Sequence, residues 1–104
     1  MTNSTPDVAQ ALEELVSMRD FFRWAASEFL AAKLFYGHGT DNPWDEAEQL
    51  VLHALHLNPP LADEWLDARL TRVEKARVVA NIQRRIEERI PAAYITGQAW
   101  FAGM

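Results

Sequence analysis

The sequence contains no cysteine, which excludes disulfides and thiolate metal ligands. No apolar run is both long enough and free enough of charge to span a bilayer. Residues 1–10 contain neither the basic region nor the apolar core of a secretory signal. From these absences we expect a soluble protein of the cytoplasm without membrane association.

Positive charge is also scarce. Ten Lys and Arg against 15 Asp and Glu give a formal net charge of -5. A nucleic-acid-binding module needs an excess of basic residues to neutralise phosphates, so we expect no direct nucleic-acid partner. A basic protein suits this charge better as a partner. The 104 residues are enough for one domain with a single hydrophobic core.

Helical periodicity dominates most of the chain. Apolar residues recur at spacings of three and four from residue 8 to residue 36, which predicts a deeply buried helical stripe. Ser17 and Asp20 have the spacing of a capping pair, which would divide the stripe into two helices. Asn42 and Pro43 are typical of a helix start, and that helix is expected to end before the proline pair that follows Asn58.

Two further helices are predicted before Pro91. A short one covers residues 62–70, and a longer one opens with a capping box at Thr71 and Glu74. The face of the longer helix that is expected to be solvated contains Arg77, Asn81, Arg84, Arg85 and Glu88. The sequence therefore predicts an all-α fold, a compact bundle of four or five helices.

The last fifteen or so residues change from helical to strand-like chemistry. Pro91 ends the helical pattern, an extended apolar run follows, Gly97 interrupts it, and a second aromatic run begins at Ala99. We therefore expect the start of a β-hairpin. The second run has no partner element to bury it, so we expect a helical domain over residues 1–91 and a hairpin linker over 92–104 that leads to a further domain.

No constellation of residues supports catalysis in this chain. His53 and His56 stand three residues apart and His38 lies in a glycine-rich loop, but they lack the glutamate and spacing of an H-E-x-x-H zinc site. None of the serines lies in a glycine elbow. We predict no catalytic, cofactor-binding or metal-binding residue.

The loop that follows the first helical stripe contains more kinds of polar and aromatic residues than a simple connection between helices requires. It combines two glycines, a histidine, a threonine, an aspartate and an asparagine with flanking aromatic residues. Loops of this kind often carry recognition, although glycines and Asn-Pro also serve only to turn the chain and cap a helix. Four tryptophans are many for this length; core filling is the expected role of each, and an interface anchor is the alternative for one of them.

Two motifs resemble one enzyme family. The terminal motif is Arg89-x-Pro91-x-x-Tyr94-Ile95-x-Gly97, followed by Phe101-x-Gly103. It resembles the junction between the helical N-terminal domain and the catalytic domain of the protein-(glutamine-N5) methyltransferases, the HemK-like enzymes, and the resemblance in layout spans the whole chain. The segment from Tyr36 to Ala47 is similar to the signature of the PrmB branch, which methylates a glutamine of a large-subunit ribosomal protein.

The resemblance implies a catalytic domain beyond residue 104. That domain would have a doubly wound sheet, a glycine-rich turn for S-adenosylmethionine and an Asn-Pro-Pro-Tyr motif that grips the substrate amide. Asn58-Pro59-Pro60-Leu61 differs from that motif at its fourth residue and ends a helix, so we assign it no catalytic role. On its own this chain is expected to be inactive.

The resemblance also implies a role for the loop in presenting a basic ribosomal protein to the catalytic domain. We expect the acidic residues Asp41, Asp45 and Glu46 to contribute to that contact. The candidate substrate contacts are Tyr36, Gly37, His38, Gly39, Thr40, Asp41, Asn42, Trp44, Asp45 and Glu46. Two alternatives remain open: a purely structural cover for the catalytic domain, and a free-standing helical interaction module.

Overall fold

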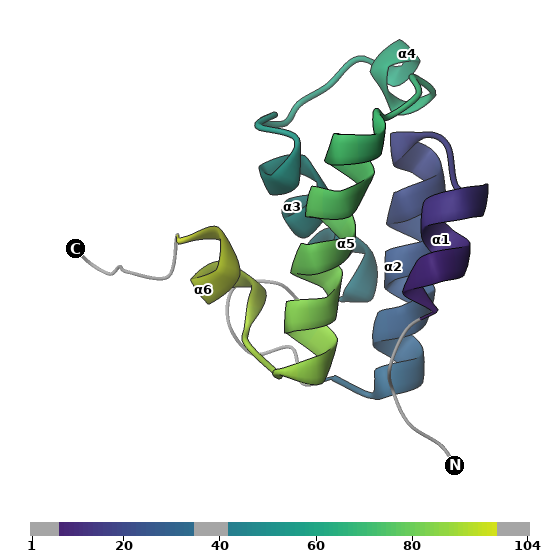
Figure 1. The fold of residues 1–104 in the computed structure, drawn as a ribbon. Helices are drawn as coiled ribbons and strands as arrows, with labels where there is room; N and C mark the ends of the chain where they lie inside the picture. Colours follow the sequence, from purple (N-terminus) through teal and green to yellow (C-terminus); the bar gives the residue numbers. More distant parts are fainter. Residues whose placement is uncertain (1–6, 35–41, 98–104) are drawn as a thin grey trace.

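The computed structural model describes residues 7–34 and 42–97, and over these residues it is helical throughout, without a strand. The elements are α1 (Val8–Glu14), α2 (Met18–Ala32), α3 (Pro43–Ala54), α4 (Asp63–Leu66), α5 (Arg72–Glu87) and α6 (Ala92–Thr96). Figure 1 shows α1, α2 and α5 side by side, with α4 at one end of the bundle and α6 beside the other end of α5. The all-α prediction is confirmed, but the expected number of four or five helices is wrong, because the described residues form six, the additional ones being short. None of the helices described is both long and apolar enough to cross a membrane.

The predicted division of the N-terminal stripe is confirmed at Ser17. The Ser17 hydroxyl accepts a hydrogen bond from the backbone N–H of Asp20 at 3.2 Å. The Asp20 carboxylate accepts hydrogen bonds from the backbone N–H groups of Ser17 at 3.0 Å and Val16 at 2.8 Å. These backbone donors stabilise the ionised carboxylate and lower the pKa of Asp20. This reciprocal capping box fixes the start of α2 and separates it from α1.

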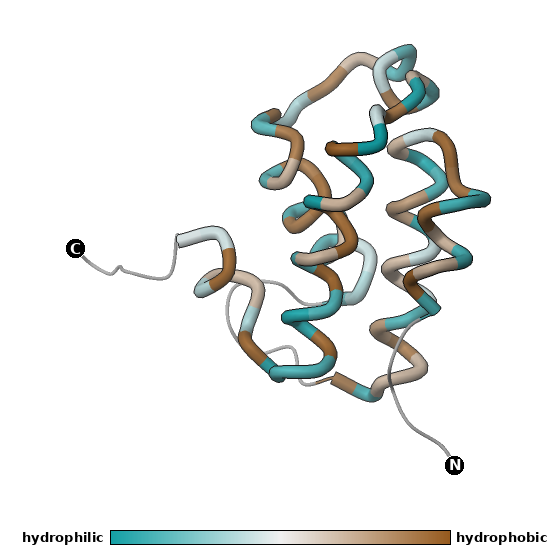
Figure 2. The backbone as a smooth tube through the Cα atoms, in the orientation of Figure 1, coloured by the Kyte–Doolittle hydropathy of each residue, from teal (hydrophilic) through white to brown (hydrophobic). Residues whose placement is uncertain are grey.

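The core lies where α2, α3 and α5 meet. Its largest fully buried side chains are Phe21, Phe22, Phe29, Leu50, Val51, Val78, Ile82 and Ile86. Each such side chain contributes about 1.5–3 kcal/mol by leaving water, so these contacts dominate the stability of the bundle. Figure 2 shows apolar and polar segments alternating along the tube, as expected for helices that bury one face. Leu30 is an exception among the apolar residues of α2, since it is 62% exposed.

The capping box at the start of α5 is confirmed. The Thr71 hydroxyl accepts from the Glu74 N–H at 3.0 Å, and the Glu74 carboxylate accepts from the Thr71 N–H at 2.8 Å. The face of α5 that was expected to be solvated instead packs in part against α3. Asn81 donates its side-chain amide to the Leu50 carbonyl at 3.2 Å, and Arg77 donates Nε to the Ala54 carbonyl at 3.1 Å. The second bond satisfies a carbonyl that the end of α3 leaves without a helical partner.

The expectation of a β-hairpin is wrong for the residues described. The run after Pro91 forms the short helix α6, in which the N–H groups of Tyr94 and Ile95 donate to the Pro91 carbonyl at 2.9 and 3.2 Å. Ala92 and Ile95 are buried, whereas Tyr94 is 60% exposed. Burial at a spacing of three is helical, since a strand would place Ala92 and Tyr94 on the same face. The second half of the predicted hairpin, Ala99–Gly103, lies outside the described residues.

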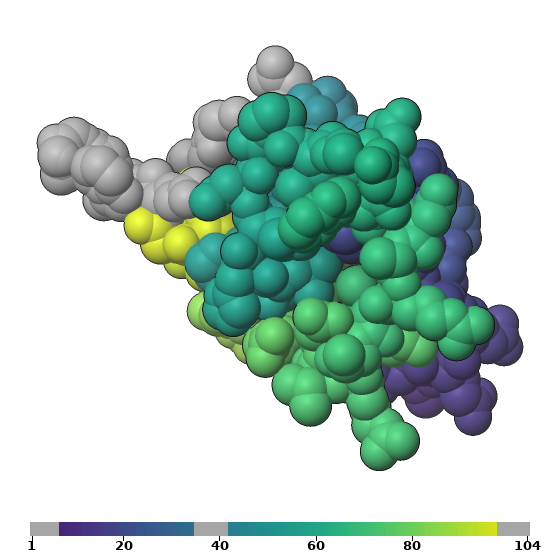
Figure 3. Space-filling model, turned by 90° about the horizontal axis from the view of Figure 1, so that it is seen from above, coloured from purple at the N-terminus to yellow at the C-terminus, as the bar shows by residue number. Residues whose placement is uncertain are grey.

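The position of α6 against the bundle explains why this segment is helical. Figure 3 shows α6, in yellow, directly against α3, in teal, and α6 contacts both α3 and α5. Gly97 ends α6 in a left-handed conformation with a φ of 80°. A five-residue helix is not stable in isolation, so its burial against α3 and α5 is what selects it over the extended form.

Candidate functional site

Only part of the predicted contact surface lies within the described residues. Tyr36, Gly37, His38, Gly39, Thr40 and Asp41 lie outside them. Asn42, Trp44, Asp45 and Glu46 come together at the N-terminal end of α3. The structure separates these four residues into an outward-facing group and one inward-facing side chain.

Asn42 and Asp45 form the cap of α3. The Asn42 side-chain carbonyl accepts from the Asp45 N–H at 2.8 Å, and the Asn42 amide donates to the Asp45 carboxylate at 3.1 Å. Pro43 occupies the first helical turn, where its missing N–H costs nothing. The positive end of the helix dipole also favours the Asp45 carboxylate. The cap thus holds an exposed carboxylate in one place at the surface.

Trp44 is anchored on one side and open on the other. Its ring meets the ring of Phe22 edge to face, with centroids 5.9 Å apart and planes at 72°. The residue is nevertheless 44% exposed. A fixed and half-exposed indole loses little conformational freedom when a partner covers it, which is typical of interface anchors. Trp44 is therefore suited to contact a partner beside the Asp45 carboxylate.

Glu46 points into the protein and serves a different purpose. Its carboxylate accepts from Arg85 Nε at 2.7 Å, and the two side chains are only 4% and 5% exposed. This ion pair joins α3 to α5. Glu46 precedes the buried Leu50 by four residues and so shares its helical face, a spacing that already indicated burial. Glu46 therefore holds α3 against α5, and its carboxylate is not accessible to a partner protein.

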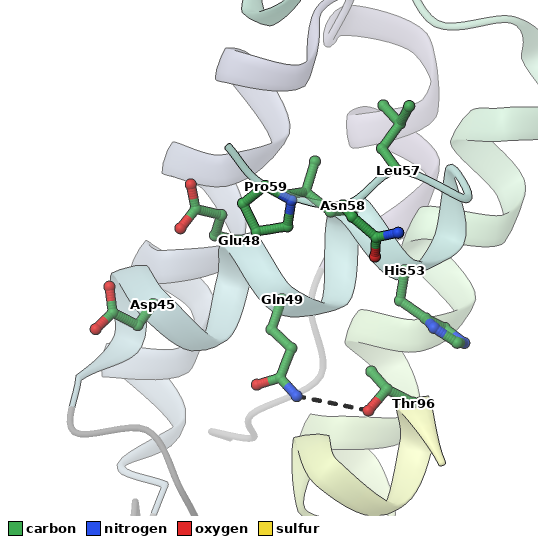
Figure 4. A pocket seen from close by; sticks show the side chains of 9 residues that line it. Asp45, Glu48, Gln49, His53, Leu57, Asn58, Pro59 and Thr96 are labelled. Carbon is green, nitrogen blue, oxygen red and sulfur yellow. Dashed lines mark hydrogen bonds between the residues drawn. The ribbon is translucent and has the colours of Figure 1, made fainter. Parts of the chain in front are cut away.

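A pocket of about 200 Å³ lies beside Asp45 on the outer face of α3. Its lining residues are Asp45, Glu48, Gln49, Leu52, His53, Leu57, Asn58, Pro59 and Thr96 (Figure 4). Gln49 donates its side-chain amide to the Thr96 hydroxyl at 3.5 Å, which links α3 to the end of α6. Apart from Asp45, sequence reasoning missed these residues as a site. The i, i+3, i+4 spacing of Asp45, Glu48 and Gln49 was the available signal.

The arrangement fits binding better than catalysis. In the described ranges, no three His, Cys, Asp or Glu side chains are grouped as a metal ion would require. His53 and His56 are both exposed on the surface. What the surface offers is an anchored indole, a fixed carboxylate and a small pocket, which together can hold a protein segment.

Comparison with known proteins gives a consistent assignment. A family model described as the PrmC N-terminal domain matches residues 21–97. The ribosomal protein uL3 glutamine methyltransferase of Bordetella pertussis is 53% identical over 91 residues, covering 88% of this chain and 30% of that protein. The protein of the same name from Xanthomonas campestris is 53% identical over 96 residues, covering 92% of this chain and 31% of that protein.

The chain spans about 30% of the length of these relatives. No solved structure gives a significant match. Because the family model covers most of the described residues, from within α2 to the end of α6, the chain belongs to the PrmC N-terminal domain family.

Proposed function

We propose that this chain is the substrate-presenting domain of an enzyme that methylates a glutamine of ribosomal protein uL3 in the cytoplasm. Its membership of the PrmC N-terminal domain family and the names of its 53% identical relatives support this function. The methyl donor would be S-adenosylmethionine. The described residues contain no strand followed by a glycine-rich turn, so we assign methyl transfer to the rest of the enzyme.

Substrate presentation matters because an amide nitrogen is a poor nucleophile. Its lone pair is delocalised, and the reaction therefore depends on holding the nitrogen in line with the donated methyl group. A helical domain that grips the substrate protein away from the reacting glutamine contributes to this positioning. The binding energy gained there helps to hold the glutamine in the reactive orientation.

The observation that supports the proposal most directly is that an anchored, half-exposed Trp44 and a fixed, exposed Asp45 stand next to each other at the start of α3. Trp44 offers a rigid apolar contact, and Asp45 offers a fixed negative charge to a basic protein. The net charge of -5 adds long-range attraction to such a substrate. Asp41 and the other loop residues directly before Asn42 remain part of the proposed contact, whereas Glu46 is left out because it is buried.

The proposed recognition domain extends to Gly97. Although the sequence suggested a boundary at Pro91, α6 packs against α3 and α5, and Gln49 is hydrogen-bonded to Thr96. We propose that the chain beyond Gly97 leads to the catalytic domain.

The test is steady-state kinetics of the full-length enzyme with purified uL3. Trp44→Ala and Asp45→Asn should each raise the KM for uL3 roughly tenfold, with kcat within about twofold of wild type. Trp65→Ala and Asp63→Asn are matched controls, because Trp65 is 50% exposed and both residues lie on α4. An unchanged KM in both α3 variants would refute the docking role.

A further inference from the structure

The pocket on the outer face of α3 lies next to the proposed contact surface. It is bordered by α3, by the turn at residues 57–59 and by Thr96 at the end of α6, and it opens to the surface. Its volume of about 200 Å³ lies below the roughly 300–1,000 Å³ typical of small-molecule and cofactor sites. A space of this size suits one side chain of a partner protein.

One side of the pocket carries two carboxylates that have no cationic side chain beside them among the described residues. Asp45 and Glu48 stand one turn apart on α3, and Figure 4 shows their carboxylates on the same side of the helix. In the part of the chain that the structure describes, the ion pairs are Arg19–Asp67 and Arg85–Glu46, so neither pocket carboxylate is paired with a cation. Like charges at this spacing repel, and a bound cation would relieve that cost.

The remaining walls suit the stem of a long basic side chain. Leu52, Leu57 and Pro59 provide apolar contact, while Gln49 and Asn58 add amide groups. Lysine and arginine bury an aliphatic stem against apolar surface and keep the charged head among polar groups. Arginine fits two neighbouring carboxylates better, because its planar guanidinium presents several donors in a fixed fork.

We propose that this pocket binds an arginine side chain of the substrate ribosomal protein, with Glu48 and Asp45 as its carboxylate partners. This inference rests on the proposed function, since it names the side chain that the docking surface recognises. It adds Glu48 as a determinant of substrate affinity separate from the loop before α3 and from Trp44. The arginine contact fixes the register of the substrate on α3, and the Trp44 contact supplies apolar area.

The first test compares Glu48 variants of the full-length enzyme, with purified uL3 as the probe. Glu48→Gln should raise the KM for uL3 roughly tenfold at constant kcat, because one charged hydrogen bond is lost. Glu48→Asp should recover part of that loss. Glu13→Gln is the matched control, since Glu13 is an exposed acid on α1, away from the pocket. Equal melting temperatures will establish that each variant is folded.

The second test identifies the arginine. Exposed arginines of uL3 are replaced one at a time by alanine, and each variant is assayed with wild-type enzyme and with Glu48→Gln. Replacing one particular arginine should raise the KM with wild-type enzyme. The same replacement should have little further effect with the Glu48→Gln enzyme, since the two residues act as one pair. Replacing that arginine by lysine should also weaken binding.

Three outcomes would overturn the inference: a Glu48→Gln enzyme with wild-type KM, the absence of any coupled arginine, or full affinity with lysine at the coupled position. If Trp44→Ala still raises the KM, substrate presentation stands and only the pocket assignment fails. If neither Trp44→Ala nor Glu48→Gln changes the KM, the docking role itself fails.

Discussion

The fold should depend strongly on keeping both partners of the buried ion pair between Glu46 and Arg85. Arg85 Nε and Glu46 Oε1 are 2.7 Å apart, and the two side chains are 5% and 4% exposed. At an effective dielectric constant of about 20, their attraction is about 6 kcal/mol. Removing the ions from water costs several kcal/mol each, so the intact pair contributes little net stability.

Breaking the pair has a different cost, because it leaves one charge buried without its main partner. Replacing Arg85 alone by methionine, or Glu46 alone by leucine, should lower the free energy of unfolding by about 3–5 kcal/mol. Replacing both residues together should change it by no more than about 1 kcal/mol, because apolar side chains of similar volume fill the same space. The double variant should therefore lose far less stability than the two single variants combined, which is the mark of strong favourable coupling between the two residues.

The assay is urea denaturation of the purified 104-residue chain, followed by circular dichroism at neutral pH. The double variant serves as the control for packing. Two results would refute the reasoning: a single variant that loses less than about 1 kcal/mol, or a double variant that loses as much as the two single variants combined.

Other substitutions test the caps and the end of α6. Thr71→Ala removes the reciprocal cap of α5 and should lower the free energy of unfolding by about 1 kcal/mol relative to wild type, measured by urea denaturation. The lowered pKa of Asp20 means that its ionised form stabilises the fold above the unfolded-state pKa and that this stabilisation is lost as the pH falls through the lowered pKa. The stability difference between wild type and Asp20→Asn should accordingly be largest near neutral pH and shrink on acidification; a constant difference would contradict the assignment. Gly97→Ala should cost about 1 kcal/mol from its positive φ alone, since no atom lies within 4 Å of the added carbon.

Local chemistry made several features of the fold predictable from the sequence. The helix starts at Ser17, Asn42 and Thr71 were correctly expected, because each cap depends on residues only three positions apart. These signals do not depend on how the helices pack.

Features that depend on distant residues could not be predicted in the same way. Glu46 and Arg85 are 39 positions apart, and Gln49 and Thr96 are 47 apart. A local pattern can place Glu46 on the buried face of α3 and group Asp45, Glu48 and Gln49 on one side of that helix, but it cannot identify Arg85 as the partner or the turn and Thr96 as the other walls of the pocket. The residues after Pro91 illustrate the same limit, since a short apolar run with aromatic residues fits a strand or a helix until its packing partner is known.

The most direct measurement is calorimetric titration of the purified chain with purified uL3. Binding should weaken as the salt concentration rises, because the acidic surface attracts a basic protein. Combining Trp44→Ala with Asp45→Asn should lower the affinity by at least about tenfold. A chain that does not bind uL3, or a double variant that binds as tightly as wild type, would contradict the claim that this domain presents the substrate.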